Sequence, residues 1–566
     1  LTSAPVRARV LVPLYLLLAG VVTWPLAGHL GTSLPYGTEP VATVPLFNLW
    51  TLRWDQREAG RLFRHYWDAP LFHPTAGAFA LSEPQPLTGL VFAPLAALGR
   101  NPVLAYNLVL VAALVANGLA GHRLARTLGA APVPAAVTGG LAVALPFAAA
   151  QMGVLQLVMV FPLILLVDAV MRWAPSGGRR RAALAGLWLA VSFLTCGYYG
   201  LFAAVVVLPA ALVLVRRTWF TLDRALDVGV AFGVFAVLAL PLVLGQASIT
   251  SGYQRSEDTV YGLSAGGTDF WQLPTRAHGA GFLPWVGRAT GGQALYPGTV
   301  LLLLAVAGIA MAAPRASADP QAVDDRRRVL FLLAGLVVAR LLSLGLKLDL
   351  GGFRPYDVLR HHVPGFASLR SPFRADVLTQ VFLVALAVYA LDAAWRRLGA
   401  DAAGRSPWLR VGAGALAVGV VALAVAETGV MPQRMYRVDQ ATADWAAYFD
   451  DHPATGDRVV AFMPFPSTNG VESYQGTVED MLDVLDSGGT TVNGYSGLFP
   501  ATYDELETAA RSYPDDETDA LLRRFGVTTV VADRDWLDVH PAAGDALADG
   551  YDRVFTGDDT AVYARR

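Results

Sequence analysis

Two glutamates in the first hundred residues have the sequence context of a general base. Glu39 lies in the run Tyr-Gly-Thr-Glu-Pro and Glu83 in the run Leu-Ser-Glu-Pro-Gln-Pro. The proline after each glutamate keeps the glutamate backbone extended, which limits where the carboxylate can point. A carboxylate beside a membrane surface can have its pKa raised by desolvation and can then accept a proton from a hydroxyl group. On spacing alone, each glutamate can equally be a solvated loop residue or the partner of an arginine.

The residues that could bind a phosphate group come much later in the chain. Arg340 stands inside an apolar stretch, and the loop after it contains Arg360, His361, Arg370 and Arg374. Guanidinium groups match phosphate oxygens with paired hydrogen bonds, so we predict these five residues as substrate- or phosphate-binding. Two alternatives stay open: Arg340 extends to the membrane surface, and the loop arginines anchor the chain to anionic lipid headgroups.

The histidines give a weaker signal for metal binding. His65 and His73 stand eight residues apart with no cysteine beside them, which is a poor zinc signature. Aromatic packing against the membrane is the favoured interpretation of that segment. Four residues of a later loop are either metal ligands or part of a solvated face: Glu257, Asp258, Asp269 and His278.

The composition places these residues in a polytopic membrane protein. Of the 566 residues 54% are hydrophobic and only 16% are charged, and the mean hydropathy is +0.44. About eleven apolar runs are long enough to cross a bilayer. They are 9–27, 103–124, 134–152, 155–172, 182–198, 199–215, 226–245, 299–313, 328–345, 374–395 and 409–429.

The arginines predict the orientation of these spans. Six clusters next to apolar runs mark the cytoplasmic side, because short loops rich in Arg and Lys stay inside. The clusters are Arg7 and Arg9, Arg123 and Arg126, 179–181, Arg216 and Arg217, 326–328, and Arg396 and Arg397. The N-terminus is then cytoplasmic and the long loops face outward.

Two segments of the first outer loop, 29–101, are expected to lie along the membrane surface. The apolar segment 86–99 is short and contains Pro94. If it crossed the bilayer, every later arginine cluster would change sides, so we expect it in the outer interface. The segment 46–63 is rich in aromatic residues, which also favour the interface, as do Tyr198 and Tyr199 between two later spans.

The last quarter of the chain differs from the rest. Of the 45 acidic residues, 25 follow Met431, against 10 arginines there. We predict a membrane domain at 1–430 and a soluble, extracytoplasmic, mixed α/β domain at 431–566. Its expected elements are strands at 458–465 and 527–532, helices at 477–486 and 503–525, and a strand pair at 553–563. The run 493–497 (Asn-Gly-Tyr-Ser-Gly) could contact a substrate, although a tight turn with left-handed glycines is the default interpretation.

The arrangement resembles the GT-C class of membrane glycosyltransferases, in particular the bacterial YfhO-like branch. The likeness rests on short motifs spread over nearly the whole chain. They are Glu39, Asn48-Leu49-Trp50 with Trp54, Phe72-His73-Pro74, Glu83, the run 369–374 (Leu-Arg-Ser-Pro-Phe-Arg) and the run 493–497.

The resemblance implies a helical membrane bundle and an inverting transfer of a sugar from a polyprenyl-phosphate donor on the outer face. The acceptor would be an envelope glycan, lipid or protein, and no nucleic acid is involved. Glu39 would be the catalytic base and Glu83 a second acid of the site. Many relatives carry paired acids at the first position, whereas here Pro40 and Val41 follow Glu39. A divalent metal, Mg or Mn, is therefore possible but has no paired-acid motif to support it.

Two other functions fit the sequence as alternatives. One is a transporter or flippase for lipid-linked glycans, and the other is a non-enzymatic envelope assembly factor whose C-terminal domain binds a partner. Transporters commonly show internal repeats and polar residues in mid-membrane, and neither is evident. All three functions place the chain as an integral protein of a bacterial or archaeal cell membrane.

Overall fold

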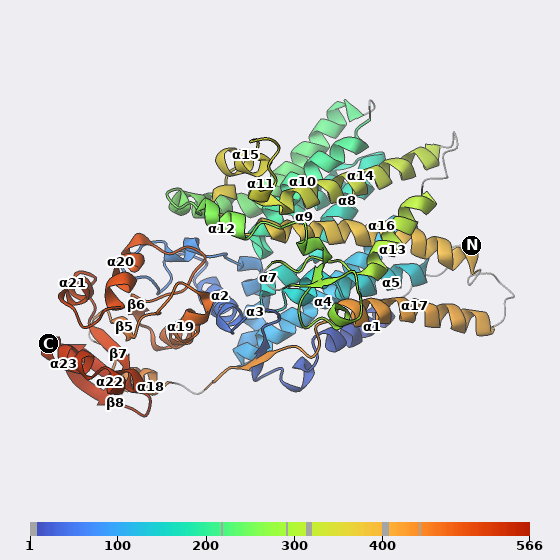
Figure 1. Ribbon diagram of the computed structural model, residues 1–566. Helices are drawn as coiled ribbons and strands as arrows, with labels where there is room; N and C mark the ends of the chain where they lie inside the picture. The colour runs from blue at the N-terminus through green and yellow to red at the C-terminus, as the bar shows by residue number, and fades with distance from the viewer. Residues whose placement is uncertain are drawn as a thin grey trace. The chain divides into compact units, whose positions relative to one another are not determined.

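The computed structural model describes residues 8–216, 219–289, 292–312, 320–398, 407–440, 443–454 and 456–566 (Figure 1). Arg7 and Arg217, two members of the predicted clusters, lie outside these residues. The chain forms two compact units, and each is described by itself. The first contains Leu1–Leu30 and Asn107–Met435, and the second contains Gly31–Tyr106 and Tyr436–Arg566. The predicted boundary near residue 430 falls after the last long helix, which ends at Thr428.

Long apolar helices make up the first unit, and every apolar run predicted from the sequence is helical. The helices are α1 (Ala8–Val22), α4 (Pro102–Thr127), α5 (Pro132–Val143), α6 (Pro146–Ala150), α7 (Leu155–Val158), α8 (Phe161–Ser176), α9 (Arg179–Thr195), α10 (Gly197–Ala211), α11 (Leu222–Thr250), α13 (Thr299–Ala312), α14 (Pro320–Ser343), α16 (Asp376–Arg397) and α17 (Pro407–Thr428). In Figure 1 the long helices of this unit run in roughly one direction, as in a bundle.

Seven of the helical segments in the described residues are long and apolar enough to cross a membrane. They are Pro102–Thr127, Pro132–Ala150, Leu155–Ser176, Gly197–Leu214, Leu222–Thr250, Pro372–Arg397 and Val411–Thr428. Three shorter apolar helices, Arg9–Val22, Pro86–Gly99 and Thr299–Ala312, add to them. The chain is therefore an integral membrane protein with a helical bundle, and the count of eleven crossings stays a prediction.

Glycines let the helices of the bundle approach closely. A Cβ atom on Gly186 would lie 2.0 Å from the carbonyl oxygen of Ala231, where α9 meets α11. A Cβ on Gly308 would lie 2.0 Å from the carbonyl oxygen of Leu386, where α13 meets α16. In lipid, helix association depends on van der Waals packing, which small residues at the contact make possible.

The second and third long loops of the first unit are joined by backbone hydrogen bonds. They contain the short helices α12 (Glu257–Gly262) and α15 (Pro355–His362). Ala265 N donates to the Ser343 carbonyl at 2.9 Å, and Phe373 N donates to the Leu263 carbonyl at 3.3 Å. The Ser264 hydroxyl accepts from Leu346 N at 3.1 Å. These bonds fix the start of the segment that contains Arg370 and Arg374.

A five-stranded sheet forms the centre of the second unit, in the order β6-β5-β7-β9-β8. Strand β5 pairs in parallel with β6 and β7, while β9 pairs antiparallel with β7 and β8. The strands are β5 (Val459–Met463), β6 (Thr490–Thr491), β7 (Thr529–Asp533), β8 (Tyr551–Thr556) and β9 (Thr560–Arg565). The helices are α18 (Asp444–Asp451), α19 (Gln475–Ser487), α20 (Ala501–Ala510), α21 (Asp516–Arg524), α22 (Arg534–Val539) and α23 (Pro541–Gly550). The mixed α/β architecture expected after residue 431 is confirmed.

The single helix expected at 503–525 is wrong. Helix α20 ends at Ala510 and α21 begins at Asp516. Pro514 lies between them, and proline disfavours the helical conformation of the residue before it and cannot donate a backbone hydrogen bond. Asp515 then caps α21 by accepting a hydrogen bond from Thr518 N at 2.8 Å.

The first loop folds onto the C-terminal segment and contributes α2 (Thr43–Ala59) and α3 (Pro86–Gly99). Helix α2 packs against α19, where Trp50 Nε1 donates to the Met481 carbonyl at 3.1 Å. Trp50 and Trp54 are only 1% and 3% exposed. These aromatic side chains therefore fill the core of the second unit and do not face a membrane surface, while the interfacial position of the segment 46–63 stays a prediction.

A second stretch of the first loop extends the edge of the sheet. His73 N donates to the Thr491 carbonyl at 3.0 Å, and Phe72 N donates to the Asn493 carbonyl at 3.2 Å. Thr491 N donates in turn to the Pro70 carbonyl at 3.3 Å. Two of the short motifs noted in the sequence, more than 400 residues apart, thus pair through their backbones.

The run 493–497 is not a turn with left-handed glycines, so that default interpretation is wrong. Neither Gly494 nor Gly497 has a positive φ angle. The Asn493 side chain instead bonds to both backbone groups of Phe462, accepting from N at 2.8 Å and donating to O at 3.0 Å. Gly494 is needed for space, because a Cβ there would lie 2.6 Å from the Phe72 ring.

This contact leads to a prediction. The Gly494→Ala variant is expected to destabilise the second unit by about 1–3 kcal/mol, because the added methyl group overlaps the Phe72 ring. The measurement is thermal unfolding of the purified chain. Gly476→Ala is the matched control, since a Cβ at Gly476 in α19 meets nothing within 4 Å. Equal stability of the two variants would contradict the packing role.

Candidate functional site

Glu39 and Glu83 each precede one of the two helices of the first loop. Glu39 closes a turn in which its backbone N donates to the Tyr36 carbonyl at 2.9 Å and Gly37 takes a φ of +55°. Glu83 lies just after the short 3₁₀ segment Ala78–Leu81 and before α3. Both side chains are half-buried. The prolines after them thus separate each carboxylate from the helix that follows.

The contacts between α2 and α3 bring these two ends together. Gln85 Nε2 donates to Asn48 Oδ1 at 2.8 Å, and further along a Cβ on Gly89 would lie 2.2 Å from Asp55 Cβ. Residue numbers rise together along the contact, so the two helices run in the same direction. The segments that carry Glu39 and Glu83 therefore precede the same end of the pair.

Asp55 is a buried acid in α2 that the sequence analysis did not single out. Its side chain is fully buried, and burial raises its pKa to about 7. The Tyr66 hydroxyl donates a hydrogen bond to Oδ1 at 2.8 Å, which lowers the pKa by a smaller amount. The other carboxylate oxygen, Oδ2, has no hydrogen-bond partner. The signal in the sequence was an acid directly after Trp54 in an aromatic helix.

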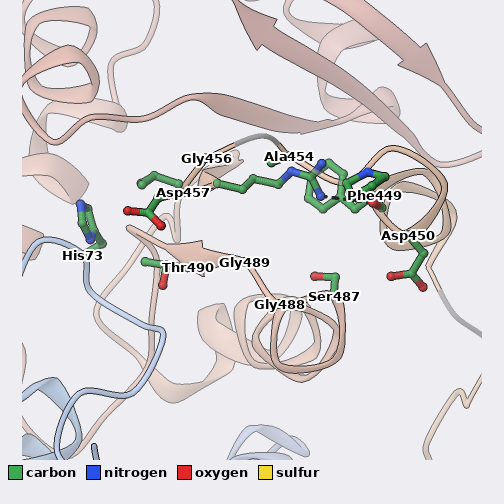
Figure 2. A pocket seen from close by; sticks show the side chains of 13 residues that line it. His73, Phe449, Asp450, Ala454, Gly456, Asp457, Ser487, Gly488, Gly489 and Thr490 are labelled. Atoms are coloured by element: carbon green, nitrogen blue, oxygen red, sulfur yellow. Dashed lines mark hydrogen bonds between the residues drawn. The ribbon is translucent and has the colours of Figure 1, made fainter.

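His73 lines a pocket of about 510 Å³ in the second unit. Figure 2 shows the Asp457 carboxylate directed toward the His73 ring across the pocket. Burial lowers the pKa of His73, and the nearby Asp457 charge partly opposes that shift. The pocket opens where β5 and β6 begin, and Ser487, Gly488 and Gly489 form another of its walls. His65 does not line it.

In the first unit, Tyr198 brings Arg370 and Arg374 together. The Arg374 guanidinium lies over the Tyr198 ring, 4.6 Å from its centroid. The Tyr198 hydroxyl accepts a hydrogen bond from Arg370 N at 3.1 Å. Tyr198 and Tyr199 are 8% and 0% exposed, so the membrane-surface position expected for them is wrong.

Arg340 is paired with an aspartate carboxylate. Its guanidinium forms an ion pair with Asp376 at 2.9 Å and lies over the Phe270 ring, 3.8 Å from the centroid. Asp376 is fully buried and is the first residue of α16, directly after the segment with Arg374. This ion pair is inconsistent with the alternative in which the Arg340 side chain extends freely to the membrane surface.

Arg360 and His361 lie on α15. Arg360 forms an ion pair with Asp357 at 3.2 Å and a longer one with Glu257 at 4.0 Å, and it donates to the Arg255 carbonyl at 2.9 Å. His361 is exposed, and its Nδ1 lies 2.7 Å from the Asp357 carbonyl oxygen. Arg360 is thus held by carboxylates and a backbone carbonyl of the protein itself.

Among the residues that the structure describes, no group of three or more His, Cys, Asp or Glu side chains could hold a metal ion. Asp269 is instead buried and accepts from Gly266 N at 2.8 Å. His278 Nε2 lies 2.7 Å from the Met431 carbonyl oxygen. The interpretation of this loop as a set of metal ligands is therefore not supported by the described side chains.

Comparison with known proteins shows a likeness in fold. No sequence family and no curated protein sequence matches the chain. The solved structure of the mycobacterial arabinofuranosyltransferase AftD matches with a TM-score of 0.58 at 15% identity, over 100% of this chain and 40% of AftD. The oligosaccharyltransferase AglB from Archaeoglobus fulgidus, in complex with an inhibitory peptide and a dolichol-phosphate, matches with a TM-score of 0.54 at 12% identity, over 98% of this chain and 74% of AglB.

Both solved proteins are glycosyltransferases of the GT-C class, so the GT-C-like fold expected from the sequence is confirmed. The chain spans about two fifths of the length of AftD. The YfhO-like branch stays a prediction.

Asp55 gives a testable pH dependence. Its pKa is near 4 in the unfolded chain and about 7 in the fold, so the unfolded state loses its proton first. The contribution of Asp55 to stability therefore falls as the pH rises from about 4 to about 7, by on the order of 4 kcal/mol, and is constant above that range.

The test compares thermal unfolding of the wild-type chain and the Asp55→Asn variant from pH 5 to pH 8. The variant keeps an oxygen that accepts from Tyr66 but cannot ionise, so its stability should fall less with rising pH. Asp558→Asn, an exposed acid at the turn before β9, is the control. Parallel pH profiles for wild type and Asp55→Asn would show that Asp55 does not titrate in this range.

Proposed function

We propose that the chain transfers a sugar from a polyprenyl-phosphate donor to an envelope glycan, lipid or protein on the outer face of the membrane, with inversion at the anomeric carbon. The fold shared with two glycosyltransferases supports glycosyl transfer. The dolichol-phosphate bound by AglB supports a polyprenyl-phosphate ligand. The N-terminus would be cytoplasmic and the C-terminal segment extracytoplasmic, as the arginine clusters predict.

One observation carries the phosphate part of this proposal, namely the state of Arg374. The residue is only 8% exposed, and no described carboxylate lies within 4 Å of its guanidinium. Its Nε atom has no hydrogen-bond partner. A buried charge without a partner costs several kcal/mol, so an anionic ligand at this position would remove a large penalty.

The neighbours of Arg374 fit a phosphate ligand. Arg340 already has Asp376 and Arg360 has Asp357, whereas the charge of Arg374 is balanced only by the face of Tyr198. The backbone N of Arg370 donates to the Tyr198 hydroxyl, so Arg370 lies beside the same residue. We therefore assign Arg374 and Arg370 as the main phosphate contacts. Arg340, Arg360 and His361 remain predicted contacts with weaker support.

Glu39 would act as the general base. It would take the proton from an acceptor hydroxyl while that oxygen bonds to the anomeric carbon and the bond from that carbon to the phosphate oxygen breaks. The phosphate leaves on the lipid with its negative charge, which preorganised arginines stabilise. Attack from the side opposite the phosphate inverts the anomeric centre. Glu83 would be a second acid of the site. A divalent Mg or Mn ion stays a prediction from the resemblance, and no step here runs through it.

The first prediction of this proposal concerns donor binding. Arg374→Gln should weaken binding of a polyprenyl phosphate by about 10- to 100-fold, because charge-assisted hydrogen bonds to the phosphate are lost. Arg374→Lys should give an intermediate loss, since it keeps the charge without the planar fork. Arg354→Gln is the control, because Arg354 is a more exposed arginine of the same loop that pairs with Asp349. Unchanged binding in Arg374→Gln would remove this residue from the phosphate site.

The second prediction concerns the chemical step. Glu39→Gln should lower the rate of sugar transfer by about 10²- to 10⁴-fold and leave polyprenyl-phosphate binding unchanged. Glu83→Gln is measured alongside, and Glu517→Gln, an exposed glutamate in α21, is the control. Undiminished transfer in Glu39→Gln would exclude it as the base. Lipid translocation by a wild-type chain that transfers no sugar would favour the transporter alternative.

A further inference from the structure

A second cluster of arginines lies at the end of the first unit's helices that is opposite to Arg340 and Arg374. A pocket of about 550 Å³ is lined by five arginines and no carboxylate: Arg123, Arg126, Arg172, Arg181 and Arg328. They come from the C-terminal parts of α4 and α8, the first turn of α9 and the N-terminal half of α14. Four helices thus aim guanidinium groups at one hollow.

This basic pocket is separate from the candidate functional site. Arg328 and Arg340 both belong to α14 and are twelve residues apart. At 1.5 Å per residue, their positions differ by about 18 Å along the helix axis. Ligand binding at the basic pocket therefore does not depend on the proposed sugar transfer.

Acids neutralise only part of the charge in the basic pocket. Asp168, whose side chain is 2% exposed, pairs with Arg123 at 2.9 Å and with Arg172 at 3.5 Å. Asp325 pairs with Arg328 at 3.4 Å. Among the described residues, two acids thus pair with three of the five arginines, which leaves a positive excess. Guanidinium groups gathered in one hollow repel one another unless an anion lies among them.

Two arginines of the basic pocket have no described carboxylate partner. Arg126 donates to the Ala130 carbonyl, and Arg181 donates to the Ser176 hydroxyl and to the Gly177 carbonyl. Each guanidinium has five N–H donors, so both keep donors for a ligand. The planar fork of arginine matches the oxygens of a phosphate group.

Exposed leucines lie beside the basic pocket. A smaller hollow shares Met171, Pro175 and Arg328 with it and is also lined by Ala174, Leu214, Arg216 and Arg327. Leu208 and Leu212, just before Leu214, are 59% and 70% exposed. Exposed leucines on a membrane helix face lipid chains. A ligand with a charged head and apolar tails would meet arginines with its head and these side chains with its tails.

We propose that the basic pocket binds the phosphate of an anionic membrane lipid. Arginines that only set topology need no common pocket, whereas these five converge on one from four helices. The exposed leucines beside the pocket, Leu208 and Leu212, favour a lipid headgroup over free phosphate as the source. A lipid bound there would link the parts of α4, α8, α9 and α14 that carry these arginines.

The test is thermal unfolding of the full chain in uncharged detergent with added phosphatidylglycerol, phosphatidylcholine or inorganic phosphate. Phosphatidylglycerol should raise Tm by several degrees and saturate, while phosphatidylcholine should not. Arg126→Gln with Arg181→Gln should weaken the apparent affinity for phosphatidylglycerol by about tenfold or more, because two charge-assisted contacts are lost. Neither change removes the partner of Asp168 or Asp325.

The matched control is Arg179→Gln with Arg180→Gln, which removes the same charge from neighbouring residues outside the lining. It should keep the wild-type affinity. The single Arg181→Gln variant changes an exposed side chain and should lose part of the affinity even if the double variant does not fold. An equal loss in the control would overturn the proposal in favour of general surface charge. An equal shift with inorganic phosphate would overturn the lipid as the source.

Discussion

Burial of the first loop against the C-terminal sheet is the constraint on which the second unit depends. Backbone hydrogen bonds between Phe72 and Asn493 and between His73 and Thr491 extend the sheet edge. A hydrogen bond from the Trp50 side chain to the backbone of α19 joins α2 to that helix. These contacts bury aromatic side chains that would otherwise need a membrane surface. The loop that carries Glu39 and Glu83 is thereby a structured part of an α/β unit, and each of the two glutamates precedes a helix of that unit.

Charge balance organises the first unit in a comparable way. Two arginines of this unit pair with buried acids, Arg340 with Asp376 and Arg123 with Asp168. Arg374 has only an aromatic face, and the basic pocket has more arginines than acids. Arg374 and the basic pocket, the two places with unbalanced positive charge, lie toward opposite ends of α14. Both proposals about phosphate therefore follow from guanidinium groups whose charge the described carboxylates do not balance.

Local patterns in the sequence predicted elements well where one physical signal dominated. The apolar runs are all helical, the segment 86–99 is α3 (Pro86–Gly99), and the strand pair around residue 557 is present. Errors arose where tertiary contacts decided. Pro514 divided a predicted helix, and the aromatic residues of α2 turned inward because α19 lies beside it. The buried acid Asp55 was missed because its isolation depends on Gly89 and Tyr66, which are distant in sequence.

The sequence by itself determined that the chain is a helical membrane protein with an acidic α/β segment, because hydropathy and charge act locally along the chain. It also pointed to Glu39, Glu83 and the arginines of 360–374 as the residues worth testing. Only the tertiary structure decided which arginines have carboxylate partners, which first-loop residues are buried, and that 72–73 pair with 491–493. Those outcomes depend on contacts between residues far apart in the chain, which no local pattern contains.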